Sequence, residues 1–117
     1  MLTFTGALKV FVAVQPADLR KSFTGLHALT TNVLKERPDS GGLFVFTNQR
    51  HNRVKVLYWD GTGFWVMTKR LERGTFCWPV AADETDGKLA LRPEALVLLL
   101  DGVDLRQGSL RPWYRRE

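Results

Sequence analysis

The stretch from residue 43 to residue 79 limits the possible folds most, because short apolar runs alternate there with tight polar turns. The turns are NQRHN, DGTG and ERG, and each is short enough to join neighbouring antiparallel strands. We therefore expect an antiparallel β-meander in this part of the chain. Its predicted strands are Leu43–Asn48, Arg53–Trp59, Phe64–Leu71 and a fourth at Thr75–Trp78.

Helices and further strands are predicted on either side of this meander. Leu8–Val14 is apolar and β-branched, which is typical of a strand. An amphipathic helix follows it, with Asp18 and Ser22 as candidates for its N-cap. Its apolar positions recur at helical spacing at Leu19, Phe23, Leu26, Leu29 or Thr30, and Val33.

The second half of the chain adds one more strand and one more helix. A short strand is predicted at Leu89–Leu91. Pro93 suits the first turn of a helix that Gly102 can close, and the apolar run between them predicts a helix that is buried or covers a sheet edge. The fold class is therefore α+β, with about five mainly antiparallel strands, one N-terminal helix and one C-terminal helix.

Length and charge narrow the class of protein. The 117 residues suit a single domain, 1–117, with a core at about 8–106 and a flexible basic tail at 107–117. Lys and Arg number 17 against 12 Asp and Glu, and this balance favours an anionic partner such as DNA or RNA. The single cysteine, Cys77, permits no intrachain disulfide and fits a reducing cytoplasm. Neither a signal peptide nor a membrane span is predicted.

The DGTG turn predicts how the side chains divide between the two faces of the sheet. If Trp59 lies opposite Phe64, then Arg53 lies opposite Arg70, and these side chains share one face with Lys55. We expect the other face to form the core under a helix. Its members are Val54, Val56, Tyr58, Trp65, Met67 and Lys69, joined by Phe44 and Phe46 if Arg53 lies opposite Thr47.

The first of these faces is the candidate binding surface. It runs from an aromatic end to a cationic end, and an open sheet of this kind can grip a phosphate backbone and stack bases. The alternative is a set of solvated charges beside packed aromatic rings. The candidate nucleic-acid-binding residues, which include basic positions near the first helix and after the third meander strand, are Arg20, Lys21, Arg53, Lys55, Trp59, Lys69, Arg70 and Arg73.

No catalytic, metal or cofactor site is predicted. Most acidic residues fall in turns or caps, and Asp83, Glu84 and Asp86 form a surface loop. His27 and His51 lie apart on different elements, so a ligand pair is not expected. The sequence also has no phosphate-cradling or dinucleotide-binding motif. We therefore expect a protein that is not an enzyme.

Three segments resemble one family of bacterial mobile-element proteins. They are ADLRKSFTGL (17–26), GLFVFTNQRHNRVKVLYWDGTGFWV (42–66) and KRLERGTFCWP (69–79). The chain is similar to the small accessory protein TnpB of family sixty-six of the insertion sequences, which shares only its name with RNA-guided nucleases. Ser22, where glycine is common, and Cys77 depart from the family pattern. The positions on its motifs are Asp18, Arg20, Lys21, Trp59, Asp60, Gly61, Lys69, Arg70, Arg73, Gly74, Trp78 and Pro79.

The resemblance implies a role in DNA transposition beside a separate, larger transposase that carries the catalytic carboxylates. It assigns no catalytic residue to this chain. Two hypotheses remain open at this point. The protein binds nucleic acid, or it docks on the transposase or on a sister accessory protein without touching nucleic acid.

Overall fold

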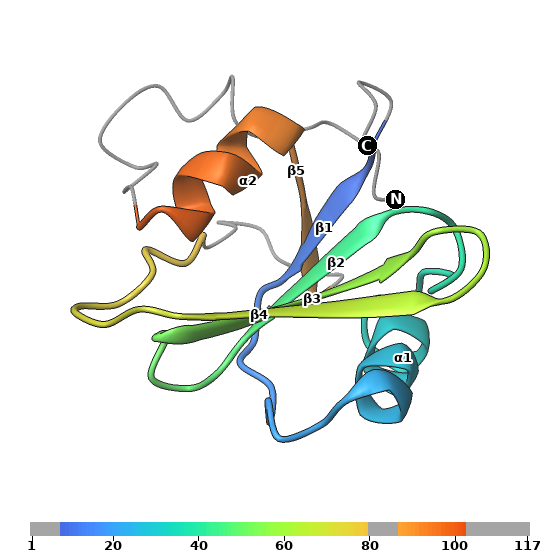
Figure 1. Cartoon of the computed structure of the whole chain (residues 1–117), viewed down its shortest axis with the longest axis horizontal. Helices are drawn as coiled ribbons and strands as arrows, with labels where there is room; N and C mark the ends of the chain where they lie inside the picture. Colours follow the sequence, from blue (N-terminus) through green and yellow to red (C-terminus); the bar gives the residue numbers. More distant parts are fainter. Residues whose placement is uncertain (1–7, 80–86, 103–117) are drawn as a thin grey trace.

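A computed structural model describes residues 8–79 and 87–102 of the chain. Five strands form one sheet in the order β4-β3-β2-β1-β5, and the two helices pack on opposite faces of it (Figure 1). The α+β class is therefore confirmed. In chain order the elements are β1 (Val10–Ala13), α1 (Phe23–Asn32), β2 (Leu43–Thr47), β3 (Arg53–Trp59), β4 (Phe64–Arg70), β5 (Lys88–Leu91) and α2 (Pro93–Leu100).

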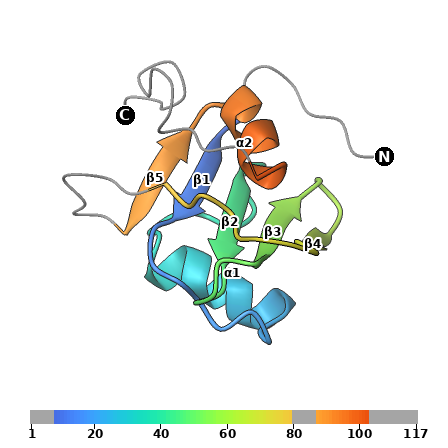
Figure 2. The ribbon, with the colours of Figure 1, turned by 90° about the vertical axis from the view of Figure 1, so that its left-hand side faces the viewer.

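The sheet is antiparallel except for one pair. β1 and β2 run parallel, while β2–β3, β3–β4 and β1–β5 are antiparallel. A parallel pair needs a long crossover connection, and the segment that contains α1 supplies it. The predicted meander is thus confirmed for β2, β3 and β4. In Figure 2, β4 lies at one edge of the sheet and β5 at the other.

Both faces of the sheet carry a hydrophobic core, because a helix covers each of them. This explains why every residue of β1 and β2 is buried and why all of them except Thr47 are apolar. On the α2 face the buried strand residues include Val10, Val12, Leu43, Val45, Val54 and Val56. On the α1 face the core is Phe11, Ala13, Leu19, Leu26, Leu34, Phe44, Phe46, Leu57 and Ala90.

The predicted pairing of β3 with β4 is confirmed, but that of β2 with β3 is wrong by one residue. Trp59 lies opposite Phe64 and Arg53 opposite Arg70. Thr47, however, lies opposite Val54 instead of Arg53. Because side chains alternate along a strand, this shift moves Phe44 and Phe46 to the face that carries Leu57, under α1. The face predicted to be open is therefore largely a second core.

The predicted strand at Thr75–Trp78 is also wrong. Among residues 8–79 and 87–102 this segment pairs with no strand, and it anchors two aromatic side chains in the core on the α2 face. The indole Nε1 of Trp78 donates to the carbonyl oxygen of Ala13 at 2.8 Å. The backbone N–H of Phe76 donates to the carbonyl oxygen of His51 at 2.6 Å. Contacts of these two rings, rather than a ladder, fix the path of the chain.

The first helix is shorter than its apolar pattern predicts. It begins at Phe23, so Leu19 is buried just before it, and Phe23 and Val33 are half exposed. Ser22, one of the two predicted N-caps, occupies the N-cap position but makes no side-chain cap bond, and Asp18 bonds Arg20 instead.

The second helix fits its predicted bounds. Pro93 occupies its first turn, and Gly102 follows it with a φ of 85°. The helix buries Ala95, Leu96 and Leu99, whereas Val97 keeps 59% of its surface exposed. The acidic residues Asp83, Glu84 and Asp86 and the basic tail lie outside the described residues.

The core under α1 can be tested with a matched pair of phenylalanines. Phe44 is fully buried, whereas Phe23 is 49% exposed. We expect Phe44→Ala to lower the free energy of unfolding by about 3–5 kcal/mol, because it leaves a cavity. Phe23→Ala should cost about 1 kcal/mol or less. Urea denaturation monitored by circular dichroism checks both values, and similar costs would contradict a core on this face.

Candidate nucleic-acid interface

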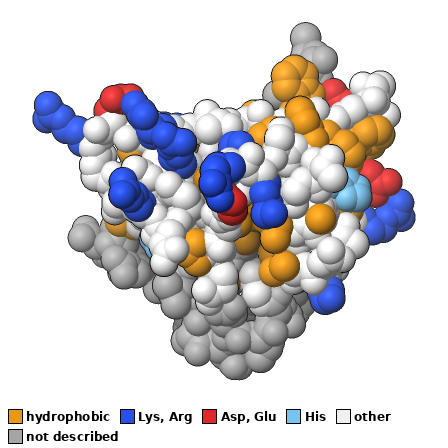
Figure 3. Space-filling model, turned by 90° about the horizontal axis from the view of Figure 1, so that it is seen from below, with side chains coloured by type: hydrophobic (Ala, Val, Ile, Leu, Met, Phe, Trp, Pro, Cys, Tyr) orange, Lys and Arg blue, Asp and Glu red, His pale blue; other side chains and the backbone are white. Residues whose placement is uncertain are grey.

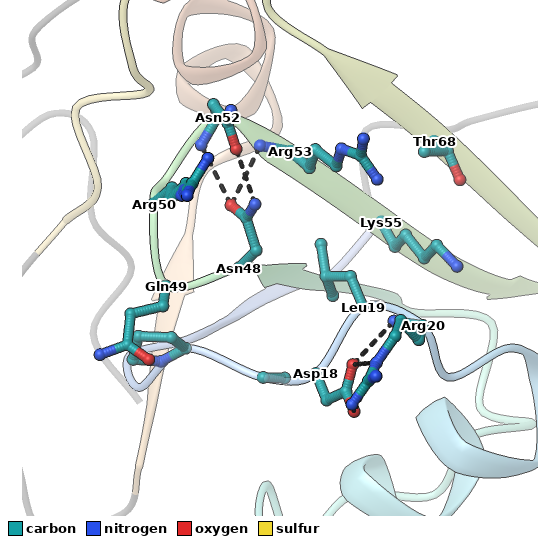
Figure 4. Close-up of a pocket in the computed structure, with 12 residues that line it drawn as sticks. Asp18, Leu19, Arg20, Asn48, Gln49, Arg50, Asn52, Arg53, Lys55 and Thr68 are labelled. Atoms are coloured by element: carbon teal, nitrogen blue, oxygen red, sulfur yellow. Dashed lines mark hydrogen bonds and ion pairs between the residues drawn. The ribbon is translucent and has the colours of Figure 1, made fainter.

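A groove opens on the α1 face of the sheet, beside the turn between β2 and β3. Its volume is about 860 Å³. Figure 4 shows the parts of the chain that meet there: the segment before α1, the β2–β3 turn, the first half of β3 and Thr68 of β4. The residues that line it are Pro16, Ala17, Asp18, Leu19, Arg20, Asn48, Gln49, Arg50, Asn52, Arg53, Lys55 and Thr68.

The side chain of Asn48 organises the turn on one wall of the groove. Its Oδ1 accepts from the backbone N–H groups of Asn52 and Arg53 at 3.0 and 3.1 Å. Its Nδ2 donates to Oδ1 of Asn52 at 2.6 Å. An amide side chain that bonds nearby backbone in this way replaces part of a regular turn. These bonds hold Arg50 at the turn and Arg53 at the start of β3.

The segment before α1 forms the opposite wall. The backbone N–H of Ala17 donates to the carbonyl oxygen of Thr47 at 2.8 Å, which ties this segment to the end of β2. Asp18 then accepts from the backbone N–H and the Nε of Arg20, each at 3.0 Å, and from Nη2 at 2.9 Å. The side-chain hydrogen bonds from Arg20 are the main reason why the pKa of Asp18 falls from 3.8 to about 2.

The two walls are joined by Lys55, whose Nζ donates to the carbonyl oxygen of Lys21 at 3.0 Å. Arg53 lies two residues before Lys55, on the same face of β3 and opposite Arg70 of β4. The side chains of Arg53 and Arg70 are both exposed. Within the described residues, no carboxylate lies within ion-pair distance of Arg53. Arg70 has only a distant one, Glu72 at 3.8 Å.

The groove therefore carries an excess of positive charge. Four cationic side chains line it, Arg20, Arg50, Arg53 and Lys55, and Asp18 is the single carboxylate among the lining residues. Figure 3 shows Lys and Arg side chains gathered on part of the face seen from below. Like charges that line one groove favour an anion between them, and guanidinium groups match phosphate oxygens well.

Not all predicted site residues come together here. Arg20, Arg53 and Lys55 line the groove, and Arg70 lies beside it as the cross-strand neighbour of Arg53. Lys21 contributes its carbonyl oxygen to Lys55. Arg73 is exposed in the turn after β4 and does not line the groove.

Two other predicted site residues lie elsewhere. Strand alternation puts Lys69 on the α2 face, where its Nζ donates to the carbonyl oxygen of Leu100 at 2.7 Å. Trp59 is half buried at the opposite end of β3, with its ring 4.9 Å from that of Phe64. Phe64 in turn contacts the ring of His27 on α1. The aromatic end is therefore partly covered by α1.

Sequence reasoning missed Arg50 and the asparagines that position it. The segment NQRHN reads as a polar turn, and only the folded chain shows that this turn faces the segment before α1. The one sequence feature that could have indicated Arg50 as a site residue is its place in a turn between two asparagines. This signal was weak, because a solvated arginine in a turn is common.

Asp60 shapes the aromatic end of the β3–β4 hairpin. Its Oδ1 accepts from the backbone N–H groups of Thr62 and Gly63, and its Oδ2 accepts from Nε1 of Trp65 at 2.8 Å. These bonds, led by the Thr62 amide, hold the pKa of Asp60 far below its ordinary value. They also fix the ring of Trp65, which remains 44% exposed.

The described residues hold no group of three His, Cys, Asp or Glu side chains that could bind a metal ion. His27 packs edge-on against Phe64, and His51 lies near the ring of Trp78.

Comparison with known proteins supports the resemblance in the sequence. Residues 8–109 match the family model described as IS66 Orf2 like protein. The chain belongs to this family. Its members are the TnpB or Orf2 accessory proteins of IS66 insertion sequences, so membership indicates an accessory role in transposition.

Two relatives come from Sinorhizobium fredii (strain NBRC 101917 / NGR234). The uncharacterized protein y4jC is 39% identical over 105 residues, which cover 90% of this chain and 87% of y4jC. The uncharacterized protein y4hO is 39% identical over 107 residues, which cover 90% of each chain. No solved structure matches the chain significantly. In the part of the chain that the structure describes, neither helix has the length and apolarity needed to cross a membrane.

The segment that carries Arg20 depends on Gly25 in α1. A Cβ at residue 25 would lie 2.5 Å from the Cβ of Lys21, too close to be relieved by turning the lysine side chain. Alanine usually stabilises a helix interior by about 1 kcal/mol relative to glycine. We expect Gly25→Ala to lower the Tm instead, as measured by circular dichroism. Gly63→Ala, at a site with open space, is the control, and an unchanged or higher Tm for Gly25→Ala would contradict the contact.

The bond between Asp18 and Arg20 predicts a pH dependence. Because the pKa of Asp18 is lower in the folded chain than its ordinary 3.8, the ionised carboxylate stabilises the fold above about pH 4. This contribution is lost as the pH falls through the folded value of about 2. We expect the difference in Tm between wild type and Asp18→Asn to narrow from pH 4 to pH 2. A carboxylate titration by NMR should give the low pKa directly, and a difference in Tm that does not vary with pH would contradict it.

Proposed function

We propose that this protein assists transposition in the bacterial cytoplasm by binding DNA through the groove between the segment before α1 and the β2–β3 turn. The observation that supports the proposal is the meeting of Arg20, Arg50, Arg53 and Lys55 around one concave surface. Family membership supplies the context of transposition. The fold supplies a surface suited to a polyanion.

The arrangement of donors fits phosphate groups rather than base edges. Three of the four groove cations are arginines, and they come from a strand, a turn and a loop, so their guanidinium groups approach from different directions. Such contacts hold a nucleic-acid backbone in place and carry little sequence information. We therefore expect binding with low sequence preference and a strong dependence on salt.

The groove keeps donors available for a ligand. Asp18 engages the Nε and Nη2 atoms of Arg20, and none of the described residues accepts from its Nη1. The guanidinium of Arg53 makes no hydrogen bond to the described residues. Arg53 and Arg70 also repel each other across the two strands, and a bound phosphate would relieve this repulsion.

The groove can be tested with a double variant. We expect Arg50→Ala with Arg53→Ala to weaken binding to duplex DNA from the element end, because two phosphate contacts are lost. The plot of log binding constant against log salt concentration should lose about one unit of slope per contact. Fluorescence anisotropy at several salt concentrations measures both effects.

Arg92→Ala is a matched control, because Arg92 is an exposed arginine at the start of α2, outside the groove. It removes one positive charge from outside the groove, against two from inside it in the double variant, and should leave the affinity nearly unchanged. If the folded wild type fails to bind DNA at low salt, or if Arg92→Ala weakens binding as much as the double variant, the proposed groove is wrong.

A second candidate function is docking on the transposase or on a sister accessory protein. An apolar groove of about 330 Å³ between β4 and α2 favours it, with Met67, Leu96, Val97 and Leu100 among its lining residues. Capture of purified transposase without DNA would favour docking. The capture should be lost in a variant of this apolar groove and kept in the double arginine variant.

A further inference from the structure

The free edge of β4 has a pattern that complements itself. β4 pairs on one side with β3, and within the described residues no strand pairs with its other side. We propose that β4 binds β4 of a second copy of this chain, antiparallel, across a two-fold axis at Met67. The partner is inferred from the order of charges and rings along the strand.

The hydrogen bonds that end the β3–β4 ladder fix which backbone groups face outward. The N–H of Asp60 donates to the carbonyl oxygen of Gly63 at 3.1 Å, and that of Leu71 to the carbonyl oxygen of Asn52 at 3.0 Å. Hydrogen-bonded pairs alternate along an antiparallel ladder. The groups that bond β3 therefore belong to Trp65, Met67 and Lys69, and the outward groups belong to Phe64, Val66, Thr68 and Arg70.

A two-fold axis at Met67 matches these outward groups in register. Val66 then lies opposite Thr68 of the second copy, and Phe64 lies opposite its Arg70, so each pair can exchange both backbone hydrogen bonds. The two Met67 residues face each other at the axis as a pair without hydrogen bonds. All outward donors and acceptors between residues 64 and 70 find a partner in this register.

The same register also places every cation of β4 opposite an aromatic ring. Arg70 meets Phe64 of the second copy on the groove face, and Lys69 meets Trp65 on the α2 face. A cation–π contact between Arg70 and the Phe64 ring is favourable, and Lys69 can pack its aliphatic stem against Trp65. No other two-fold register aligns both cations with rings, because the two cations and the two rings occupy mirror positions about Met67. Registers centred on Lys69 or Arg70 would bring like charges together.

The side chains of β4 that would meet the second copy are held in place or exposed in the single chain. Asp60 holds the ring of Trp65 while leaving it 44% exposed. The Nζ of Lys69 lies on the C-terminus of α2, so its aliphatic stem is what the ring would contact. Arg70 keeps 57% of its side chain exposed and has Glu72 only at 3.8 Å.

The apolar groove between β4 and α2 ends at this same edge. Met67 and Val97 both line it, and Val97 is 59% exposed. Pairing at Met67 would bring the two apolar grooves together across the axis and cover part of both. Because a two-fold axis perpendicular to the sheet keeps each face on its own side, the two basic grooves would lie together on the opposite face.

The oligomeric state of the full chain tests the proposal. We expect light scattering after size exclusion, over a range of protein concentrations, to show a dimer at the higher ones. Thr68→Pro should give a monomer, because it removes an outward N–H from an edge position that tolerates proline. Thr68→Ala keeps this N–H and should remain dimeric. A monomeric wild type at all concentrations, or a dimeric Thr68→Pro protein shown by circular dichroism to be folded, would overturn the proposal.

A cross-link tests the position of the axis without relying on the proline variant. In a Cys77→Ser background, Met67→Cys should form an intermolecular disulfide under mild oxidation, since facing residues at a pair without hydrogen bonds lie close enough. Trp65→Cys in the same background is the control, because its neighbour in the second copy is Lys69. Equal cross-linking of the two variants, or none for Met67→Cys in a dimer, would place the interface elsewhere.

Discussion

The carboxamide of Asn48 is the interaction on which most of this structure depends. Its bonds to the amides of Asn52 and Arg53 close the β2–β3 turn and fix the register in which Thr47 faces Val54. From this register follow the burial of Phe44 and Phe46 under α1 and the exposure of Arg53 beside the groove. A shift of one residue would reverse both, because every side chain of the strand would change faces.

Two helices on opposite faces leave this small sheet little free surface. The central strands are buried on both sides, so polar and cationic side chains collect where the helices do not reach. One such place is the end of the sheet near the β2–β3 turn, where the basic groove lies. Another is the β4 edge, where the last residues of the strand are exposed. The location of the charges is thus a consequence of how the two cores are covered.

The two proposed surfaces depend on different interactions and adjoin each other at Thr68 of β4. The basic groove offers long-range attraction to phosphates, which salt screens. The β4 edge offers directional backbone hydrogen bonds and ring contacts, which require a partner strand in one register. Pairing at the edge would also double the number of grooves on one face, and two linked weak sites bind a long polyanion more tightly than one.

The sequence by itself determined most of the elements and part of their local pairing. The DGTG turn fixed the β3–β4 register, because a short hairpin loop leaves one pairing. Pro93 and Gly102 fixed α2 through their backbone preferences, and the charge balance pointed to an anionic partner. The family motifs were also legible in the sequence, and the match over residues 8–109 confirms them.

Only the tertiary structure decided which surfaces remain open. The β2–β3 register depends on a side chain that bonds backbone across a turn, and the pattern of apolar residues does not encode it when both faces are buried. Thr75–Trp78 resembles a strand locally, but Trp78 finds its partner at Ala13, far away in the chain. Arg50 and Arg20 are likewise far apart in the chain and line one groove only in the folded structure. Contacts between distant segments arise from packing of the whole chain, and no local pattern specifies them.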